Sequence, residues 1–396
     1  MRVVFITSRF PYPLEKGDKL RAYQQIKQLA NQGHEVHLFA VSDVDVLETS
    51  KNALLPYLKS MEIHNISKFS IFKNIILSYI SGTSVQSRYF YSSDFHATLK
   101  EKICSIKPDV IYFQLVRTAR YADGLEMFPK VLDFQDAFSL GMQQRFNQEG
   151  GVLRQIFLLE SRLLADFEKS CLSDFEAFSI ISESDKKHID PDNLKNIRVI
   201  PNAVDLSYFK SSSVNKTFDL LFVGNMGYKP NIEAARYLVS EIMPLVWKKF
   251  PLASLLLAGA NPSKSVKDLE SERVKVSGWV DDIRTCYDQS RVFIAPMVSG
   301  TGLQNKLLEA LAMGLPSVTT PISAKPLAFG YDVYVKVGNT PQELANHVIQ
   351  LLNDYQSEIL KGNNPREFIS KHYDSEKIGM DLERLLLSAI EKYRKK

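Results

Sequence analysis

The sequence has little cysteine, no excess of one charge and no long apolar run. Its cysteines, Cys104, Cys171 and Cys286, are three in number and far apart. They offer no disulfide framework and no C-x-x-C metal pair, so a reducing cytoplasm fits best. With 49 Lys and Arg against 45 Asp and Glu, nucleic acid is not the expected partner.

No stretch reaches the roughly 18 consecutive apolar residues of a spanning helix, because even the run at 71–80 is interrupted by polar residues. The apolar run at 3–6 is too short for a signal peptide and predicts a first strand. The 396 residues are 45% hydrophobic and 24% charged, which is typical of a globular protein. A chain of this length favours two domains, since single cores stop growing near ~250–300 residues.

Short apolar runs alternate with helical periodicity along the first two hundred residues. After the strand at 3–6, apolar residues repeat at helical spacing from Leu20 to Ala30, and Gly33 ends that helix. Further strands are predicted at 35–41, 110–113, 130–134, 177–182 and 198–200. Such alternation predicts a parallel sheet with helices on both faces.

The polar, aperiodic segment 210–216 predicts a boundary, after which the alternation begins again. Strands are predicted at 219–223, 254–258, 274–276, 292–295, 317–319 and 333–335, and helices at 232–250 and 303–313. We therefore predict an α/β protein of two doubly wound Rossmann-like domains, 1–206 and 207–374, with a final amphipathic helix at 375–396. A nucleotide-type ligand is expected in a cleft beyond the carboxyl ends of the strands.

The segment 296–316 carries the sharpest chemical signal. Gly300 and Gly302 let the backbone approach a ligand, and the helix start behind them favours an anion such as phosphate. Lys306 and, one turn on, Glu309 are placed to hold a diphosphate and then a ribose. The candidate contacts around them are Gly300, Thr301, Gly302, Leu303 and Asn305. The alternative is a helix with a Gly-rich entry and a Lys–Glu pair on its surface. The functional interpretation is favoured, because the glycines, the two charged residues and a Gly-Leu-Pro helix end occur together.

Several motifs spread over nearly the whole chain resemble those of nucleotide-sugar glycosyltransferases of family 4, which have the GT-B fold. They are Phe10-Pro11 followed by Lys16-Gly17-Asp18, Gly33-His34-Glu35-Val36, Pro201-Asn202-Ala203-Val204-Asp205, Phe222-Val223-Gly224, Val276-Ser277-Gly278-Trp279-Val280, and Leu308-Glu309-Ala310-Leu311-Ala312 with Gly314-Leu315-Pro316. The segments 302–306 and 226–231 are most similar to a branch associated with exopolysaccharide synthesis.

This resemblance implies a retaining, metal-independent hexosyl transfer from a UDP- or GDP-linked sugar to a glycan or lipid-linked acceptor in polysaccharide or glycoconjugate synthesis. It implies an acceptor-side first domain, a nucleotide-sugar-binding second domain facing it across a cleft, and a last helix that packs back on the first. The nucleotide sugar is a substrate, so no cofactor is expected. Gly278 and Val280 join the candidate substrate-binding positions.

The sequence departs from the family pattern at three functional positions. Glu309 matches the second of two family glutamates, which holds the ribose, but Thr301 stands where the first belongs. Asn225 replaces the usual Arg, and Lys229 lies one residue before the usual Lys. We expect Lys306, together with Lys229, to neutralise the diphosphate, the alternative for Lys229 being an exposed loop lysine.

In the first domain, Gly17 permits close approach to a substrate, and Asp18 is either a substrate contact or a helix cap. Arg21 is expected to contact a ligand or merely to face solvent. Asp136 or Asp133 lies nearest the family's usual His; there Asp136 would stabilise positive charge on the sugar ring, or simply cap the next helix. The seven histidines form no metal-ligand spacing.

Basic and apolar residues accompany each other from Lys51 to Arg88. They fit contact with an anionic membrane surface, or an ordinary core helix with solvated lysines. We expect the basic tail 392–396 on the same side as Lys68 and Lys73, giving a cytoplasmic enzyme attached peripherally to the inner face of the membrane.

Two rival functions stay open. One is a nucleotide-sugar epimerase; the other is a noncatalytic nucleotide-sugar binder, which the residues at 225 and 301 favour.

Overall fold

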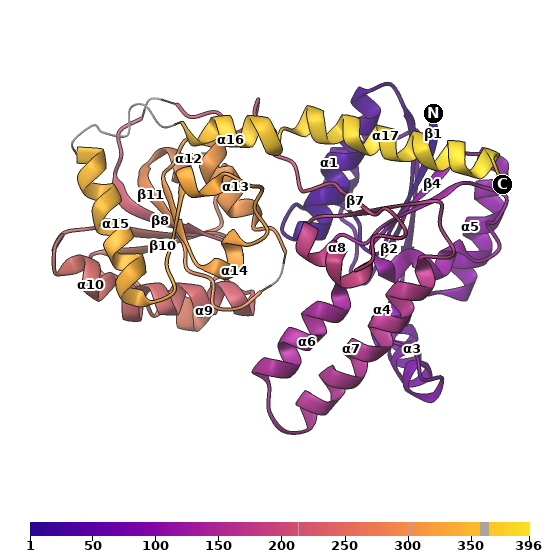
Figure 1. Ribbon diagram of the computed structural model, residues 1–396, viewed down its shortest axis with the longest axis horizontal. Coiled ribbons are helices and arrows are strands. Elements are labelled where there is room, and N and C mark those ends of the chain that lie inside the picture. Colours follow the sequence, from indigo (N-terminus) through magenta and orange to yellow (C-terminus); the bar gives the residue numbers. More distant parts are fainter. Residues whose placement is uncertain (213, 301, 357–363) are drawn as a thin grey trace. The chain divides into compact units, whose positions relative to one another are not determined.

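The computed structural model describes residues 1–212, 214–300, 302–356 and 364–396, which form two α/β units (Figure 1). The first unit comprises Met1–Pro201 with Glu376–Lys396, and the second comprises Asn202–Ser375. Each unit is built on an open parallel sheet with helices around it, so the predicted fold class is confirmed.

The sheet of the first unit has seven parallel strands in the order β3-β2-β1-β4-β5-β6-β7. The strands are β1 (Arg2–Thr7), β2 (Glu35–Ser42), β3 (Ser60–Asn65), β4 (Val110–Gln114), β5 (Lys130–Asp133), β6 (Ala177–Ile180) and β7 (Arg198–Val199). Because β1 pairs with β2 on one side and β4 on the other, the strand order reverses there. Open α/β sheets bind ligands at such a switch point, beyond the carboxyl ends of the strands.

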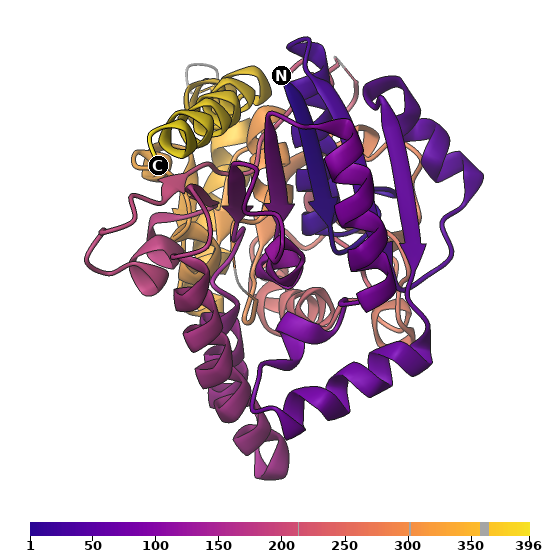
Figure 2. The same ribbon diagram turned by 90° about the vertical axis from the view of Figure 1, so that its right-hand side faces the viewer.

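The helices of the first unit fill the connections between these strands and include one long hairpin. They are α1 (Gly17–Asn31), α2 (Glu48–Leu54), η1 (Leu55–Tyr57), α3 (Lys68–Ile80), α4 (Val85–Arg88), α5 (Ser93–Ile106), η2 (Val116–Ala122), α6 (Phe138–Gln148), α7 (Gly151–Cys171), α8 (Glu183–Ile189) and the final α17 (Ser375–Arg394). The α6–α7 hairpin extends away from the sheet in both views (Figure 1, Figure 2).

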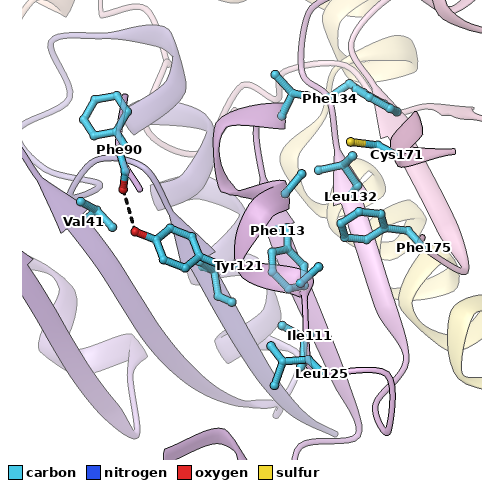
Figure 3. Close-up of a cluster of buried hydrophobic side chains, with 14 of the residues drawn as sticks. Val41, Phe90, Ile111, Phe113, Tyr121, Leu125, Leu132, Phe134, Cys171 and Phe175 are labelled. Carbon is cyan, nitrogen blue, oxygen red and sulfur yellow. Dashed lines mark hydrogen bonds between the residues drawn. The ribbon is translucent and has the colours of Figure 1, made fainter. Parts of the chain in front are cut away.

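Alternate residues of β1 enter two different cores, because successive side chains of a strand point to opposite faces. Val4 and Ile6 join the cluster that Figure 3 shows, while Val3 and Phe5 join the cluster on the other face. In the first cluster the buried Tyr121 hydroxyl donates a 2.6 Å hydrogen bond to the carbonyl oxygen of Phe90. Its polar atom is thus satisfied inside an apolar core.

Helix α17 covers the second of these cores, although it follows the second unit in sequence. Its apolar face is buried against β1 and α1 and comprises Leu382, Leu385, Leu386, Ala389 and Ile390. At its end, Lys392 donates to the carbonyl oxygen of Glu176, and Lys396 lies 2.9 Å from the Glu176 carboxylate. Both views place this tail far from α3, so the expectation that it shares a side with Lys68 and Lys73 is wrong (Figure 1, Figure 2).

The sheet of the second unit has six parallel strands in the order β10-β9-β8-β11-β12-β13. They are β8 (Phe218–Val223), β9 (Leu255–Ala258), β10 (Val274–Gly278), β11 (Ser290–Ala295), β12 (Ser317–Thr319) and β13 (Val335–Val337). The helices are α9 (Lys229–Tyr237), η3 (Leu238–Ile242), α10 (Met243–Trp247), α11 (Lys264–Lys267), α12 (Arg284–Asp288), α13 (Asn305–Ala312), α14 (Pro321–Ala324), η4 (Tyr331–Val333), α15 (Pro341–Gln356) and α16 (Pro365–His372). The switch point lies between β8 and β11, and α9 and α13 follow those strands.

The second unit begins five residues before the predicted boundary of 206/207. Asn202 donates to the Asn305 side chain at 2.8 Å, and Val204 forms an isolated bridge with Asp374. The guanidinium of Arg366 donates to the carbonyl oxygens of Leu206, Phe209 and Ala312, the last at 2.8 Å. These bonds attach 202–209 to the second unit, which sequence periodicity could not reveal.

Candidate functional site

Two glycines shape the turn that follows β8 at the switch point. A Cβ atom on Gly259, at φ +137°, would lie 1.9 Å from the carbonyl oxygen of Gly224. A Cβ atom on Gly224 would lie 2.8 Å from Nδ2 of Asn231, the third residue of α9. Only glycine permits this close packing, and it holds Asn231 beside the end of β8.

The connection from β11 to α13 also depends on glycine. Gly300 and Gly302 have φ values of +118° and +73°, where other residues are strained. Helix α13 begins at Asn305 rather than at 303, and the Asn305 side chain accepts from Asn202. Leu303, two residues before the start of α13, is buried. Thr301, the remaining candidate here, lies outside the described residues.

Lys306, in the first turn of α13, turns its ammonium group toward β8 and α9. Its Nζ donates to Oδ1 of Asn231 at 2.5 Å, lies 3.6 Å from the Met297 sulfur and is 4.8 Å from the centre of the Phe222 ring. Burial lowers the pKa of Lys306 to about 7 from 10.5, although Glu309 partly opposes this. A cation held by an amide oxygen, a thioether and a ring is well placed to accept an anionic ligand.

Glu309 faces the same region from the next turn of α13. The Tyr287 hydroxyl, on α12, donates to Glu309 Oε2 at 2.9 Å and approaches the carbonyl oxygen of Lys306 at 3.2 Å. Burial raises the pKa of Glu309, while the Tyr287 hydrogen bond and the charge of Lys306 lower it. Neither side chain is freely exposed, so the alternative of a surface Lys–Glu pair is wrong.

Three residues of this region carry contacts that sequence reasoning did not assign. Asn231 binds Lys306, Tyr287 binds Glu309, and Glu233 Oε2 accepts from Ser299 Oγ at 2.5 Å, which ties the loop before α13 to α9. They come from α9 and α12, far from α13 in sequence. No spacing rule connects such residues, because the sheet order brings them together.

Asn225 and Lys229 differ in how they are held. Asn225 Oδ1 accepts from the amide of Gly227 at 3.0 Å, and its carbonyl oxygen accepts from Asn231. The side chain thus stabilises its own turn, as Asn commonly does. Lys229 is the first residue of α9, with a side chain 73% exposed and 4.0 Å from Glu233. An exposed lysine, the alternative for Lys229, matches this placement.

Gly278 and Val280 lie where β10 ends. Gly278 has φ +68°, and Val280 is half-buried two residues later. Since β10 is separated from β8 only by β9, both positions belong to the same carboxyl edge of the sheet as α9 and α13.

In the first unit, Gly17 begins α1 and Asp18 lies in its first turn. Lys16 is the N-cap residue, so the interpretation of Asp18 as the cap is wrong. The Asp18 carboxylate accepts from Arg9 at 2.7 Å. Burial raises the pKa of Asp18, but the positive charges of Arg9 and Arg117 outweigh it and leave the pKa below its usual value.

Arg21 does not face solvent. Its Nε and Nη2 donate to the two carboxylate oxygens of Asp133 at 2.7 and 3.0 Å, with both side chains buried. Asp133 also accepts from the Ser179 hydroxyl at 2.8 Å. The Asp133 carboxylate, at the end of β5, therefore stabilises the first unit through its buried partners.

Asp136 lies just beyond β5 and does not cap α6, whose N-cap residue is Ala137. The preceding Gln135 has φ +61°, and Asp136 Oδ1 is buried with no hydrogen-bond partner among the described residues. Burial, aided by the charge of Asp185, raises the pKa of Asp136 to about 7. The group is therefore an acid poised near neutrality, a property common at functional sites.

Metal ligands do not gather in the part of the chain that the structure describes. No group of three or more His, Cys, Asp or Glu side chains there could hold an ion. Asp43 and Asp45 form an Asp-x-Asp sequence directly after β2, and Asp45 accepts from Asn65 at 3.4 Å.

Within the described ranges, no helix is long and apolar enough to cross a membrane.

Comparison with known proteins places this geometry in a family context. Residues 217–354 match the family model described as "Glycosyl transferases group 1". Over its full length the chain is similar to sucrose-phosphate synthase of Thermosynechococcus elongatus, with a TM-score of 0.70, 15% identity and coverage of 97% and 98% of the two chains. The chain has the GT-B fold. The resemblance inferred from the sequence motifs is thus confirmed.

Two further relatives are informative. The Anabaena protein HepE, whose structure contains UDP-glucose, has a TM-score of 0.66 and 15% identity, with coverage of 98% and 99%. A Klebsiella pneumoniae protein described as "Uncharacterized 44.6 kDa protein in cps region" is 20% identical over 95% of this chain and 97% of its own. Asn231, Tyr287, Lys306 and Glu309 all lie within the segment matched by the group 1 model.

Tyr287 is expected to support this glycosyltransferase-type domain through its hydroxyl alone. Tyr287→Phe removes the donor to Glu309 while keeping the ring, so the free energy of unfolding of the second unit should fall by about 1–3 kcal/mol. It should also raise the pKa of Glu309. Thermal unfolding measures the loss of stability, and its dependence on pH reports the change in the pKa of Glu309, with Tyr228→Phe at an exposed position as control. Equal stability of both variants would contradict the assignment.

Proposed function

We propose that the protein is a retaining glycosyltransferase that moves a hexosyl group from a UDP- or GDP-linked sugar. The observation that carries this proposal is the pairing of Lys306 with Asn231 and of Glu309 with Tyr287 at the β8/β11 switch point. It places a cation and a carboxylate on one helix, one turn apart, inside the segment matched by the group 1 model. The UDP-glucose in the structure of HepE supports a nucleotide-sugar ligand.

Lys306 and the backbone amides before α13 would hold the donor diphosphate, and Glu309 would accept hydrogen bonds from the ribose hydroxyls. In the transfer, the bond from the sugar to the diphosphate breaks and a bond to the acceptor oxygen forms on the same face. The acceptor proton passes to the departing diphosphate oxygen, so no strong base is required. Asp136 would stabilise the positive charge that develops on the sugar ring.

The proposed acceptor is a glycan or a lipid-linked saccharide of polysaccharide synthesis, handled in the cytoplasm without a divalent ion. The similarity to a protein of a cps region supports the polysaccharide context. The transfer would need no divalent ion, because Lys306 already supplies positive charge where the diphosphate would bind.

Release of the nucleotide from UDP- and GDP-sugars without acceptor tests the activity. A thermal-shift screen with UDP, GDP and their sugars first selects the donor, because a ligand of the folded state raises its apparent stability. Slow release that survives EDTA is expected, and Asp136→Asn should slow it while leaving nucleotide affinity unchanged. Binding without release under any condition would favour the noncatalytic binder. Loss with EDTA, reversed by magnesium or manganese, would overturn the metal-free mechanism.

Glu309→Gln is expected to weaken nucleotide binding by about 1–3 kcal/mol, the size of a lost hydrogen bond to a charged group. The substitution keeps the shape of the side chain and can still accept from Tyr287, so the second unit should stay folded. Calorimetric titration with the selected nucleotide measures the change. An unchanged affinity in the folded variant would remove Glu309 from the proposed ribose site.

A further inference from the structure

Helix α3 buries few of its large apolar side chains, since only Ile71 is buried in the core and Ile75 packs against it. Asn74 and Ser78 are on its buried face, where Asn74 donates to the Tyr91 carbonyl oxygen at 2.7 Å and Ser78 to that of Asn74 at 2.8 Å. Its exposed face instead carries large apolar side chains: Phe69 (78% exposed), Phe72 (61%), Ile76 (43%), Tyr79 (52%) and Ile80 (77%). A helix that only covers a core places its apolar residues inward.

A second apolar cluster lies on the distal half of the α6–α7 hairpin. Val152, Leu153, Ile156 and Leu159 are exposed along the first turns of α7. Arg154 lies 4.6 Å from the centre of the Phe146 ring, which holds α7 against α6. Both views place α3 beside the hairpin, at the end of the unit away from α17 (Figure 1, Figure 2).

The two clusters belong to one packed region. Helix α3 leads into α4, and the buried Glu160 of α7 accepts from the Ser84 hydroxyl at 2.6 Å and from the amide of Gln86 at 2.9 Å at the start of α4. The docking surface, as we call it, is therefore the exposed apolar face of α3 together with that of α7. Exposed apolar surface on neighbouring elements of this kind marks interaction sites.

The charge around the docking surface is positive. The segment 66–93 contains Lys68, Lys73 and Arg88 and no acidic residue. Arg145 and Arg154 are exposed on the hairpin, whereas two of its carboxylates, Glu160 and Glu168, are buried. A second copy of this face would bring like charges together, while an anionic lipid leaflet complements them at ~1 kcal/mol for each basic residue.

We propose that the docking surface binds the first unit to a membrane containing anionic phospholipids. The apolar side chains of α3 and α7 enter the boundary between headgroups and acyl chains, and Lys68 and Lys73 contact lipid phosphates. The C-terminal tail takes no part, since Lys392 and Lys396 contact Glu176 at the other end of the unit. Docking does not depend on the nucleotide site; only its use for a lipid-linked acceptor rests on the proposed function.

Flotation of the full-length protein with phosphatidylcholine vesicles, with or without phosphatidylglycerol, tests this proposal at low and high salt. The protein should float with the anionic vesicles at low salt and much less at high salt. The variant F72S/I80N should lose flotation at both salts, and K68E/K73E should bind anionic vesicles at least about tenfold more weakly at low salt. The control is Leu194→Ser, which removes an equally exposed apolar side chain (79%) outside the docking surface.

Nucleotide release in solution, measured on the same variants, separates this proposal from the proposed function, because it should stay at the wild-type level in all of them. Wild-type flotation of both surface variants, or no flotation of the wild-type protein, would overturn the docking surface. So would a dimer that F72S/I80N dissociates, seen by sedimentation, in a protein that binds no vesicles. Normal flotation with no nucleotide release would support the docking surface and contradict the proposed glycosyltransferase function.

Discussion

Lys306→Ala is expected to weaken binding of the UDP- or GDP-linked donor sugar by about ten- to a hundredfold, the loss of a charged hydrogen bond to the diphosphate. The pH dependence follows from the free protein, in which burial lowers the pKa of Lys306 to about 7. A bound diphosphate raises that pKa, so binding takes up a proton above about pH 7 and grows weaker as the pH rises. Below about pH 7 the lysine is already charged, and this dependence disappears.

Titration calorimetry in buffers of different ionisation enthalpy measures this uptake. The nucleotide sugar selected by the thermal-shift screen is the suitable ligand, because its diphosphate lacks the terminal phosphate that titrates near pH ~6. We expect an uptake of about 0.9 proton at pH ~8 and about 0.1 at pH ~6. Lys306→Arg should remove the uptake, since Arg stays protonated, and Lys249→Ala, which removes an exposed lysine elsewhere in the second unit, should change nothing. Unaltered affinity of Lys306→Ala would refute the diphosphate site.

Asp133→Ala is expected to lower the stability of the first unit by about 3–5 kcal/mol, because it leaves the Arg21 guanidinium buried without its carboxylate. The exposed fractions of the two side chains are 2% for Arg21 and 0% for Asp133, so water cannot replace the lost partner. Calorimetric unfolding of the full chain, followed through the transition of the first unit, measures the loss.

Two variants show whether the charge, rather than the cavity, is responsible. Ser179→Ala removes only one hydrogen-bond donor to the Asp133 carboxylate and should cost less, about 1.5–3 kcal/mol. The double variant R21M/D133L replaces the whole pair by apolar side chains and should recover most of the stability. If the double variant were as unstable as Asp133→Ala, an uncompensated buried charge could not be the cause.

Most strands could be predicted from the sequence because each is a short apolar run, and every residue of β4, β5, β6 and β9 is buried. The strand β3 was missed, since its residues Ser60–Asn65 are only half-buried and give no such run. The α6–α7 hairpin was missed as well. Its distal half packs few residues into the core and leaves apolar ones exposed, so its pattern is not that of a covering helix.

The sequence by itself determined the α/β class, the Gly-rich entry to α13 and the candidacy of Lys306 and Glu309, because glycine spacing and helical periodicity are local properties. Only the tertiary structure decided that Lys306 meets Asn231, that Glu309 meets Tyr287 and that Arg21 meets Asp133. The order of strands in each sheet brings these partners together across 75, 22 and 112 residues of chain. Burial then sets the pKa of Lys306 and of Asp136, because the cost of a charge depends on the residues packed around it and not on its neighbours in sequence.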